Sequence, residues 1–140
     1  MSATIVTREM IVAEARKWLG TPFHHQGRVM GHGVDCAGLV ACVGKALGLT
    51  CFDATGYGRS PDPRAMGGIL ARELVGIPVP EARLGDVLWM AFDKEPQHVA
   101  IVTDVGIIHA TSAIGRVVEH GVNEIWRRRI RGAFAWPGVA

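Results

Sequence analysis

The sequence is poor in cysteine, nearly balanced in charge and without a long hydrophobic run. It has three cysteines among 140 residues, an odd count that argues against a disulfide framework and predicts reduced thiols. Its net charge of +2 is far below that of most nucleic-acid-binding domains, so we expect no nucleic-acid partner. The longest apolar run, residues 34–50, contains Lys45 and three glycines and is too short to span a membrane, so it predicts a buried helix.

The N-terminal residues lack the pattern of a secretory signal. Arg8, Glu9 and Glu14 interrupt the apolar residues there, and no basic flank precedes them. We therefore expect synthesis in the cytoplasm without a signal peptide. The length and the composition, 49% apolar and 20% charged, are typical of one globular domain, which we expect to cover residues 1–140.

Positive charge is concentrated near the C-terminus. Residues 116–140 carry five arginines against two glutamates, whereas residues 1–115 carry ten basic and eleven acidic side chains. We interpret the arginine run at 127–131 as part of a strand whose arginines face solvent. Binding of an anionic polymer is the alternative.

Helical patterns occupy the first half of the chain. Thr7 can cap a first helix whose apolar side chains recur at helical spacing, and Gly20 ends that pattern. Asp35 can cap a second helix that is apolar on almost every side, as expected of a helix buried on most of its surface. Residues 63–75 predict a third, amphipathic helix. Residues 20–34 have no sustained period and predict an irregular loop.

Strand patterns occupy the second half. Short runs rich in valine, isoleucine and tryptophan alternate with turn residues at 86–92, 97–103, 106–112 and 115–122. Gaps this short favour antiparallel hairpins, because a parallel crossover needs about a dozen residues or more. Residues 125–136 add a last strand or, alternatively, an arginine-rich helix. This order predicts an α+β domain with N-terminal helices packed on a C-terminal antiparallel sheet.

Cys36 is the first candidate for chemistry, because it follows the capping residue and so lies in the first turn of a buried helix. Unpaired backbone N–H groups and the helix dipole favour a thiolate there, and a nearby imidazolium can lower the pKa from about 8.5 to well under 7. The backbone N–H of Cys36 can also donate to an oxyanion. A small buried apolar residue is the alternative for Cys36 and the main expectation for Cys42 and Cys51.

A thiolate nucleophile needs a general base, and His98 opens an otherwise apolar strand. If residues 103–106 form a four-residue loop, facing residues sum to 209, and His98 and His109 become diagonal neighbours on one face, within hydrogen-bonding reach. A three-residue loop would put the two rings on opposite faces. We predict that His98 is the base and His109 orients it, with His120 as the reserve candidate for the third residue.

A metal centre is the competing interpretation of the remaining histidines. His24, His25, His32 and Cys36 could be written as a zinc set, but their spacing matches no familiar metal motif. We therefore expect neither a metal nor another cofactor.

Three blocks of sequence, taken in order, resemble the NlpC-type cell-wall peptidases, which are small papain-like cysteine peptidases. The blocks are Trp-Leu-Gly-Thr-Pro-Phe at 18–23, Asp-Cys-Ala-Gly-Leu at 35–39, and Leu-Gly-Asp-Val-Leu at 84–88 followed by the His98 and His109 strands. The resemblance implies a papain-like fold and hydrolysis of peptide bonds in peptidoglycan stems, commonly between γ-D-glutamate and a diamino acid. It implies Cys36 as nucleophile, His98 as general base and acid, His109 as orienting residue, and no metal.

The loop at 26–34 and the compact length look most like the phage-tail and prophage branch of that family. This likeness implies delivery by a tail or related particle and tail proteins as partners. Two rivals to the peptidase hypothesis remain open. One is an amidase or acyltransferase with the same triad, and the other is a tail-assembly protein that keeps the fold without turnover.

Two positions depart from the family pattern. Phe23 stands where the family usually has tyrosine after Gly-Thr-Pro, and Ala37 stands where serine commonly follows the nucleophile. In the family these positions help to bind the N-terminal end of the stem peptide, so the loss of two hydroxyls changes the expected substrate contacts. Asp35 either serves as the helix cap alone or also contacts a substrate amine.

Overall fold

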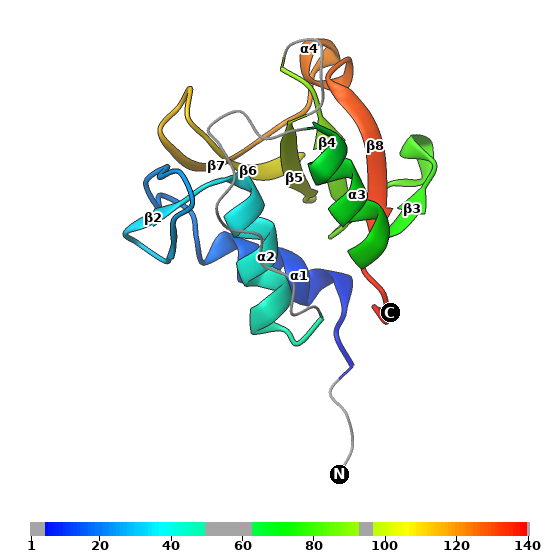
Figure 1. Cartoon of the computed structure of the whole chain (residues 1–140), viewed down its shortest axis with the longest axis horizontal. Helices are drawn as coiled ribbons and strands as arrows, with labels where there is room; N and C mark the ends of the chain where they lie inside the picture. The colour runs from blue at the N-terminus through cyan, green and yellow to red at the C-terminus, as the bar shows by residue number, and fades with distance from the viewer. Residues whose placement is uncertain (1–4, 50–62, 93–96, 140) are drawn as a thin grey trace.

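The computed structural model describes residues 5–49, 63–92 and 97–139 (Figure 1). Its helices are α1 (Arg8–Arg16), α2 (Cys36–Ala46), α3 (Pro63–Glu73) and α4 (Glu124–Arg127), with a 3-10 helix at Val79–Glu81. Its strands are β1 (Arg28–Val29), β2 (Gly33–Val34), β3 (Val75–Ile77), β4 (Val87–Met90), β5 (His98–Val102), β6 (Ile107–Thr111), β7 (Arg116–His120) and β8 (Ile130–Ala135). Helices therefore come first and most of the sheet second, as the sequence predicts.

Side-chain caps start the first two helices where the sequence places them. The hydroxyl of Thr7 accepts from the backbone N–H of Met10 at 3.2 Å. The Asp35 carboxylate accepts from the backbone N–H of Gly38 at 2.8 Å. Each cap satisfies an N–H that has no partner inside the helix. The predicted starts of α1 and α2 are confirmed.

The six strands β3 to β8 form one antiparallel sheet in the order β3-β8-β4-β5-β6-β7. Residues 125–136 contain both of the predicted alternatives, because α4 comes first and β8 follows it. β8 lies between β3 and β4, so the last strand of the chain is inside the sheet. The α+β prediction with an antiparallel sheet is confirmed.

Two short strand pairs differ from the predictions. The expected irregular loop at 20–34 contains the hairpin β1–β2, in which Arg28 pairs with Val34. The third helix ends at Glu73, because Val75 pairs with Ala135 as the first residue of β3. Both corrections have one physical reason, since strands of two or three residues carry little periodicity and depend on partners distant in sequence.

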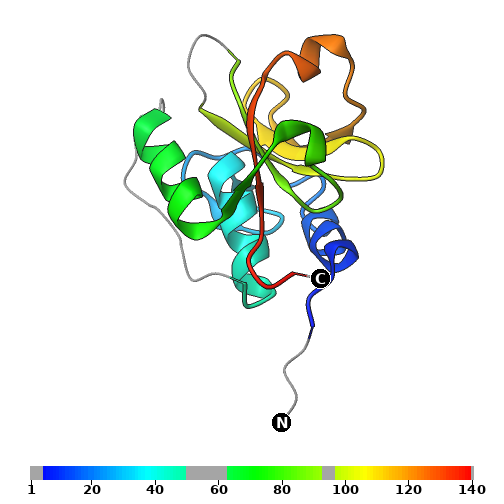
Figure 2. The same ribbon diagram turned by 90° about the vertical axis from the view of Figure 1, so that its right-hand side faces the viewer.

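The two faces of the sheet are covered differently. In Figure 2, α1, α2 and α3 lie on one side of the strands and α4 on the other. The larger buried cluster joins those three helices to side chains such as Val99, Ile108 and Val117. A smaller cluster on the other face includes Ala100, Ile107 and, from α4, Trp126. Because side chains alternate along a strand, His98, His109 and His120 belong to this second face.

The turn between β5 and β6 controls the register that the site needs. Ile101 pairs with Ile108 and Val102 with Ile107, so facing residues sum to 209, as predicted for a four-residue loop. The Thr103 hydroxyl accepts from the backbone N–H groups of Val105 and Gly106 and closes that loop. A Cβ at Gly106 would overlap the carbonyl oxygen of His120 and lie 2.7 Å from the Gly121 Cα, so only glycine lets β7 approach here.

Candidate functional site

Three histidine rings from three neighbouring strands form a continuous chain of hydrogen bonds. His98 Nε2 on β5 lies 2.6 Å from His109 Nδ1 on β6, and His109 Nε2 lies 2.9 Å from His120 Nε2 on β7. The chain ends at the Gly121 carbonyl oxygen, 2.9 Å from His120 Nδ1. The predicted contact between His98 and His109 is confirmed, and it leaves Nδ1 as the nitrogen of His98 that is outside this chain.

Cys36 meets the first histidine where β5 and β6 separate. The two strands pair only at their Ile101 and Val102 end, so the other end of β5 is open toward the first turn of α2. There the backbone N–H of Val99, the residue after His98, hydrogen-bonds the Cys36 sulfur. Cys36 and His98 line one cavity of about 340 Å³. The Cys36 thiol and the His98 ring therefore face the same space.

Burial decides the protonation state of the thiol. It raises the pKa of Cys36 to about 11, although hydrogen bonds from the backbone of Val99, Ala37 and Cys36 itself act in the opposite direction. The negative charge of Asp35 raises the pKa further. The prediction of a resting thiolate is therefore wrong, because loss of hydration outweighs the end of the helix. Cys36 rests as a neutral thiol.

The two inner histidines are also neutral. Burial lowers the pKa of His98 well below its ordinary value, and the charges of His109 and Arg129 lower it further. Burial and His120 lower the pKa of His109 to about 4. A neutral imidazole has a lone pair and can act as a base, whereas an imidazolium cannot. The buried pair is thus ready to accept a proton at neutral pH.

An aromatic cluster that the sequence did not indicate covers the histidines. Phe92 lies against the His98 ring with centroids 4.5 Å apart, and Trp126 lies 5.3 Å from His109 and 4.6 Å from His120. The Arg129 guanidinium lies over the Trp126 ring at 4.4 Å and over Phe92 at 5.1 Å. The only sequence signal was an isolated tryptophan beside an arginine run, and pairing in the sheet decides which rings it meets.

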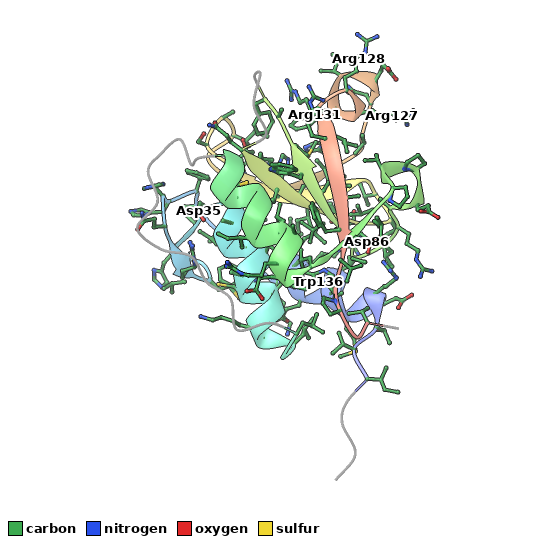
Figure 3. All side chains as sticks on the ribbon, turned by 45° about the vertical axis from the view of Figure 1, so that its right-hand side comes forward. Asp35, Asp86, Arg127, Arg128, Arg131 and Trp136 are labelled. Atoms are coloured by element: carbon green, nitrogen blue, oxygen red, sulfur yellow. The ribbon has the colours of Figure 1, made fainter. Side chains whose placement is uncertain are left out.

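The arginine run does not follow its predicted conformation. Figure 3 shows Arg127, Arg128 and Arg131 together at α4 and the start of β8. These three are exposed, but Arg129 is half-buried against the aromatic rings. The interpretation as a strand with solvent-facing arginines is therefore wrong for Arg129, and α4 precedes the strand.

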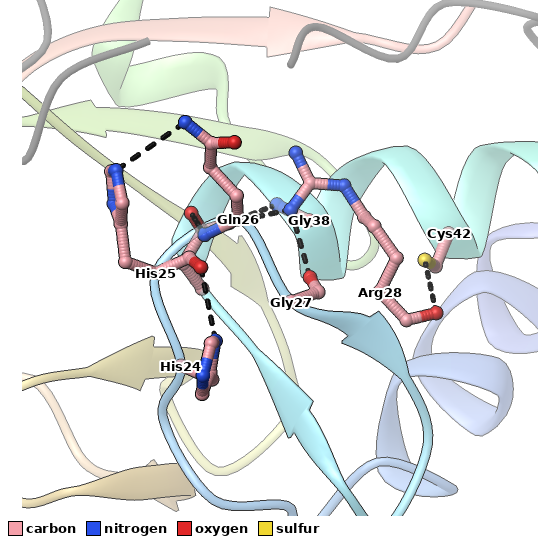
Figure 4. Close-up of polar contacts among 8 residues, drawn as sticks. His24, His25, Gln26, Gly27, Arg28, Gly38 and Cys42 are labelled. Carbon is pink, nitrogen blue, oxygen red and sulfur yellow. Dashed lines mark hydrogen bonds and ion pairs between the residues drawn. The ribbon is translucent and has the colours of Figure 1, made fainter. Parts of the chain in front are cut away.

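The first turn of α2 is held by an ion pair with the loop before it. Arg28 donates to the Asp35 carboxylate at 3.0 Å and to the Gly27 carbonyl at 2.8 Å (Figure 4). The same carboxylate also accepts from the backbone N–H of Gln26 at 2.8 Å. A Cβ at Gly38 would lie 2.6 Å from the Arg28 guanidinium, so glycine at this position makes room for the pair. Asp35 acts as the cap, and contact with a substrate amine stays a prediction.

The two departures from the family pattern both line the cavity. Phe23 and Ala37 contribute apolar surface at the two positions where the family pattern has the hydroxyl groups of tyrosine and serine. The backbone N–H of Phe23 donates to the Gly115 carbonyl at 2.8 Å, which attaches this segment beside β7. Met66 and Phe92 extend the apolar wall. The cavity thus has an apolar wall beside the Cys36 thiol and the His98 ring, and His25 and Asp35 also line it.

The other cysteines and the histidines of the competing metal interpretation can also be located in the structure. Cys42 is half-buried and bonds weakly to the Arg28 carbonyl, while Cys51 lies outside the described residues. His24 and His25 contact each other and Gln26 beside the loop, as Figure 4 shows. In the part of the chain that the structure describes, no cluster of three or more potential ligands is arranged to hold a metal ion.

Comparison with known proteins assigns the family. The model of the NlpC/P60 family matches residues 20–135. The chain belongs to the NlpC/P60 family. Because the match contains Phe23, Cys36, His98 and His109, the site described above lies within the family domain. No curated protein matches at a significant level.

Solved structures place this NlpC/P60 domain among papain-like folds. The NlpC/p60 domain of the peptidoglycan hydrolase SagA is 30% identical, with a TM-score of 0.62 over 93% of this chain and 99% of that one. An NlpC/P60 family protein from Bacillus cereus is 22% identical, with a TM-score of 0.71 over 95% of this chain and 41% of that one. The predicted papain-like α+β fold is confirmed.

The family also contains a protein without activity. RipD from Mycobacterium tuberculosis, described as a non-catalytic NlpC/p60 domain protein adapted to peptidoglycan binding, is 17% identical. Its TM-score is 0.61, and the alignment covers 93% of this chain and 96% of RipD. Membership of the NlpC/P60 family therefore supports a cell-wall role and leaves turnover to be tested on the residues themselves.

Alkylation of Cys36 should report the neutral thiol directly. With a pKa of about 11, reaction with iodoacetamide should be slow at pH 6.5 and rise about tenfold per pH unit up to pH 10, because the thiolate is the reactive form. Peptide mapping by mass spectrometry measures the rate, with Cys42 in the same sample as the reference. A rate that is already at its plateau below pH 7 would restore the thiolate of the sequence-based prediction.

Proposed function

We propose that this NlpC/P60 domain is a cysteine peptidase that hydrolyses peptide bonds in the stem peptides of bacterial peptidoglycan. The observation that carries the proposal is the His98–His109 contact of 2.6 Å beside a thiol in the same cavity. A nucleophile, a base and a residue that orients the base are the parts that thiol hydrolysis requires. Cys36, His98 and His109 supply them in that order.

In the acylation step, Cys36 and His98 act together on the substrate carbonyl. The thiol proton moves to Nδ1 of His98 while the sulfur bonds to the carbonyl carbon, so no charge has to be carried by either group beforehand. Backbone N–H groups in the first turn of α2 stabilise the oxyanion that forms. Collapse breaks the carbon–nitrogen bond, and His98 returns its proton to the departing amine. A thioester on Cys36 remains.

In the deacylation step, water replaces the amine. His98 takes a proton from the water while the water oxygen bonds to the thioester carbon. The carbon–sulfur bond then breaks. The proton then passes from His98 to the Cys36 sulfur, which restores the neutral pair. His109 holds the His98 ring through both steps, as the third residue of other triads does.

The bond that we propose is the one between γ-D-glutamate and the diamino acid, as the resemblance to NlpC-type peptidases implies. An apolar wall at Phe23, Ala37 and Met66 favours uncharged parts of the stem on that side of Cys36. The Asp35 carboxylate already has a cationic partner in Arg28, so a substrate amine would have to share it. Phe23, Asp35 and Ala37 are thus proposed substrate-binding residues.

The setting in which the protein acts is a further part of the proposal. We propose association with a phage tail or a related particle, on the likeness of the loop at 26–34. Within residues 5–49, 63–92 and 97–139, none of the helices has the length and apolar character needed to cross a membrane. Tail proteins as partners stay a prediction.

Digestion of purified peptidoglycan, followed by mass spectrometry of the soluble products, tests this proposal. We expect fragments ending at γ-D-glutamate together with fragments that begin at the diamino acid. Release of whole stems from the lactyl group would indicate an amidase, and transfer to an added amine would indicate an acyltransferase. Binding of the sacculus without any released fragment would overturn the peptidase proposal in favour of a non-catalytic protein.

A further inference from the structure

The hydrogen bond at the outer end of the histidine chain fixes the tautomer of every ring in it. A carbonyl oxygen can only accept, so His120 Nδ1 must donate to the Gly121 carbonyl. In neutral His120, Nε2 then has the lone pair and accepts from His109 Nε2 at 2.9 Å. His109 Nδ1 in turn accepts from His98 Nε2 at 2.6 Å.

This order of donors and acceptors determines whether His98 Nδ1 can accept the proton of the Cys36 thiol. Once His98 Nε2 carries the proton, His98 Nδ1 keeps its lone pair. That lone pair is what a neutral thiol needs for proton transfer. If His120 Nε2 donated to His109 instead of accepting from it, each ring would carry its hydrogen on the other nitrogen. His98 Nδ1 would then carry a hydrogen. The base would then be blocked although all three rings remained in place.

The surroundings of His120 favour the accepting state. On β6 the facing group is the His109 ring, and on α4 it is the uncharged Trp126 ring at 4.6 Å. Arg129 stacks on the Trp126 ring at 4.4 Å, and its guanidinium can donate hydrogen bonds but cannot accept them. Glu119, the neighbour of His120 on β7, points to the opposite face and pairs with Arg16 of α1 at 2.7 Å. Among the described residues, no carboxylate bonds to His120.

We propose that His120 is a positioning residue that sets the direction of the histidine chain and thereby keeps His98 Nδ1 free to accept the Cys36 proton. This role rests on the proposed function, and it adds a fourth residue to the three that the sequence predicts. This task differs from that of a substitute third residue, because His109 and not His120 hydrogen-bonds His98.

Nuclear magnetic resonance of the imidazole nitrogens tests the chain without any substrate. Long-range proton–nitrogen correlation spectra of uniformly ¹⁵N-labelled protein at pH 7.5 distinguish the two tautomers of each ring. We expect hydrogens on Nε2 of His98 and His109 and on Nδ1 of His120. A hydrogen on Nδ1 of His98, or of His109, would overturn the proposal whether or not the protein digests peptidoglycan.

Two substitutions of His120 distinguish a role in setting the direction of the hydrogen bonds from a role in packing alone. His120→Gln keeps a carbonyl oxygen that can accept from His109, so we expect wild-type tautomers and a kcat close to that of the wild type. His120→Lys presents only donors, so we expect the reversed tautomers and a kcat lowered about 100-fold with little change in KM, in the range of a lost general base. Because His120 is half-buried, both variants should fold.

Ile125→Lys is the matched control for the added charge, since Ile125 lies on α4 and its side chain is 64% exposed. It should leave tautomers and kcat unchanged. Equal loss of kcat in the glutamine and lysine variants, with unchanged tautomers in both, would overturn the positioning role. If the wild type digests nothing while its spectra show the expected tautomers, the proposed function fails and the direction of the chain stands.

Discussion

Replacing Cys36 by alanine should abolish the release of peptide fragments from purified peptidoglycan. The substitution removes the thiol that lines the cavity with His98, so no acyl-enzyme can form. Loss of the nucleophile from a triad typically lowers turnover by about 10⁴-fold or more, because the remaining residues cannot form the covalent intermediate. Chromatography and mass spectrometry of the soluble fragments measure the effect.

Cys42→Ala is the matched control for this experiment. Cys42 lies on the same helix as Cys36 and is half-buried, but its sulfur bonds weakly to the Arg28 carbonyl and it is not part of the cavity lining. Its loss should lower stability modestly and leave turnover unchanged. Circular dichroism should show the same fold for both variants. Equal digestion by Cys36→Ala and the wild type would end the cysteine-peptidase proposal.

Lowering the pH from 7 to 4 should destabilise the folded protein through its buried histidines. The pKa of His109 is about 4 in the folded state, below its ordinary value of 6.5. Between these two values the unfolded chain binds a proton that the folded chain does not, so the free energy of unfolding falls as the pH falls. For His109 alone the loss is about 2 kcal/mol at pH 5 and about 3 kcal/mol at pH 4.

His98 acts in the same direction, because burial also lowers its pKa. Urea unfolding followed by tryptophan fluorescence at pH 7, 6 and 5 measures the slope. His109→Gln should flatten it, since glutamine does not titrate, whereas His32→Gln at an exposed position should not. The pKa of Glu119 is lowered by its bond to Arg16, so its contribution is lost at lower pH. A stability that does not change between pH 7 and pH 5 would contradict the neutral, buried pair.

The main elements of the fold could be predicted because their signals are local. Thr7 and Asp35 each precede an apolar helical pattern, and each caps the helix that the structure shows. The sequence left the length of the 103–106 loop open between three and four residues, and the structure shows four, closed by the Thr103 hydroxyl. From that length followed the register that brings His98 to His109.

The remainder of the site depended on contacts between distant segments. The hairpin at Arg28 and the strand at Val75 are too short for a periodic signal. Trp126 and Arg129 were visible as residue types, but only the pairing of β8 beside β4 brings them over the histidines. The predicted thiolate of Cys36 was wrong for the same reason, because its pKa depends on how completely α2 and β5 bury it.

The sequence by itself determined which side chains are available for chemistry, and it predicted that one thiol and one histidine pair belong to a single site. Local caps, periodicity and one loop length carried that information. Only the tertiary structure decided the charge state of Cys36 and the inner histidines. Only the tertiary structure brought His120 and the Gly121 carbonyl to the outer end of the chain of hydrogen bonds between the histidines. Hydration and hydrogen-bond direction depend on every neighbour of a group, and most of those neighbours are distant in sequence.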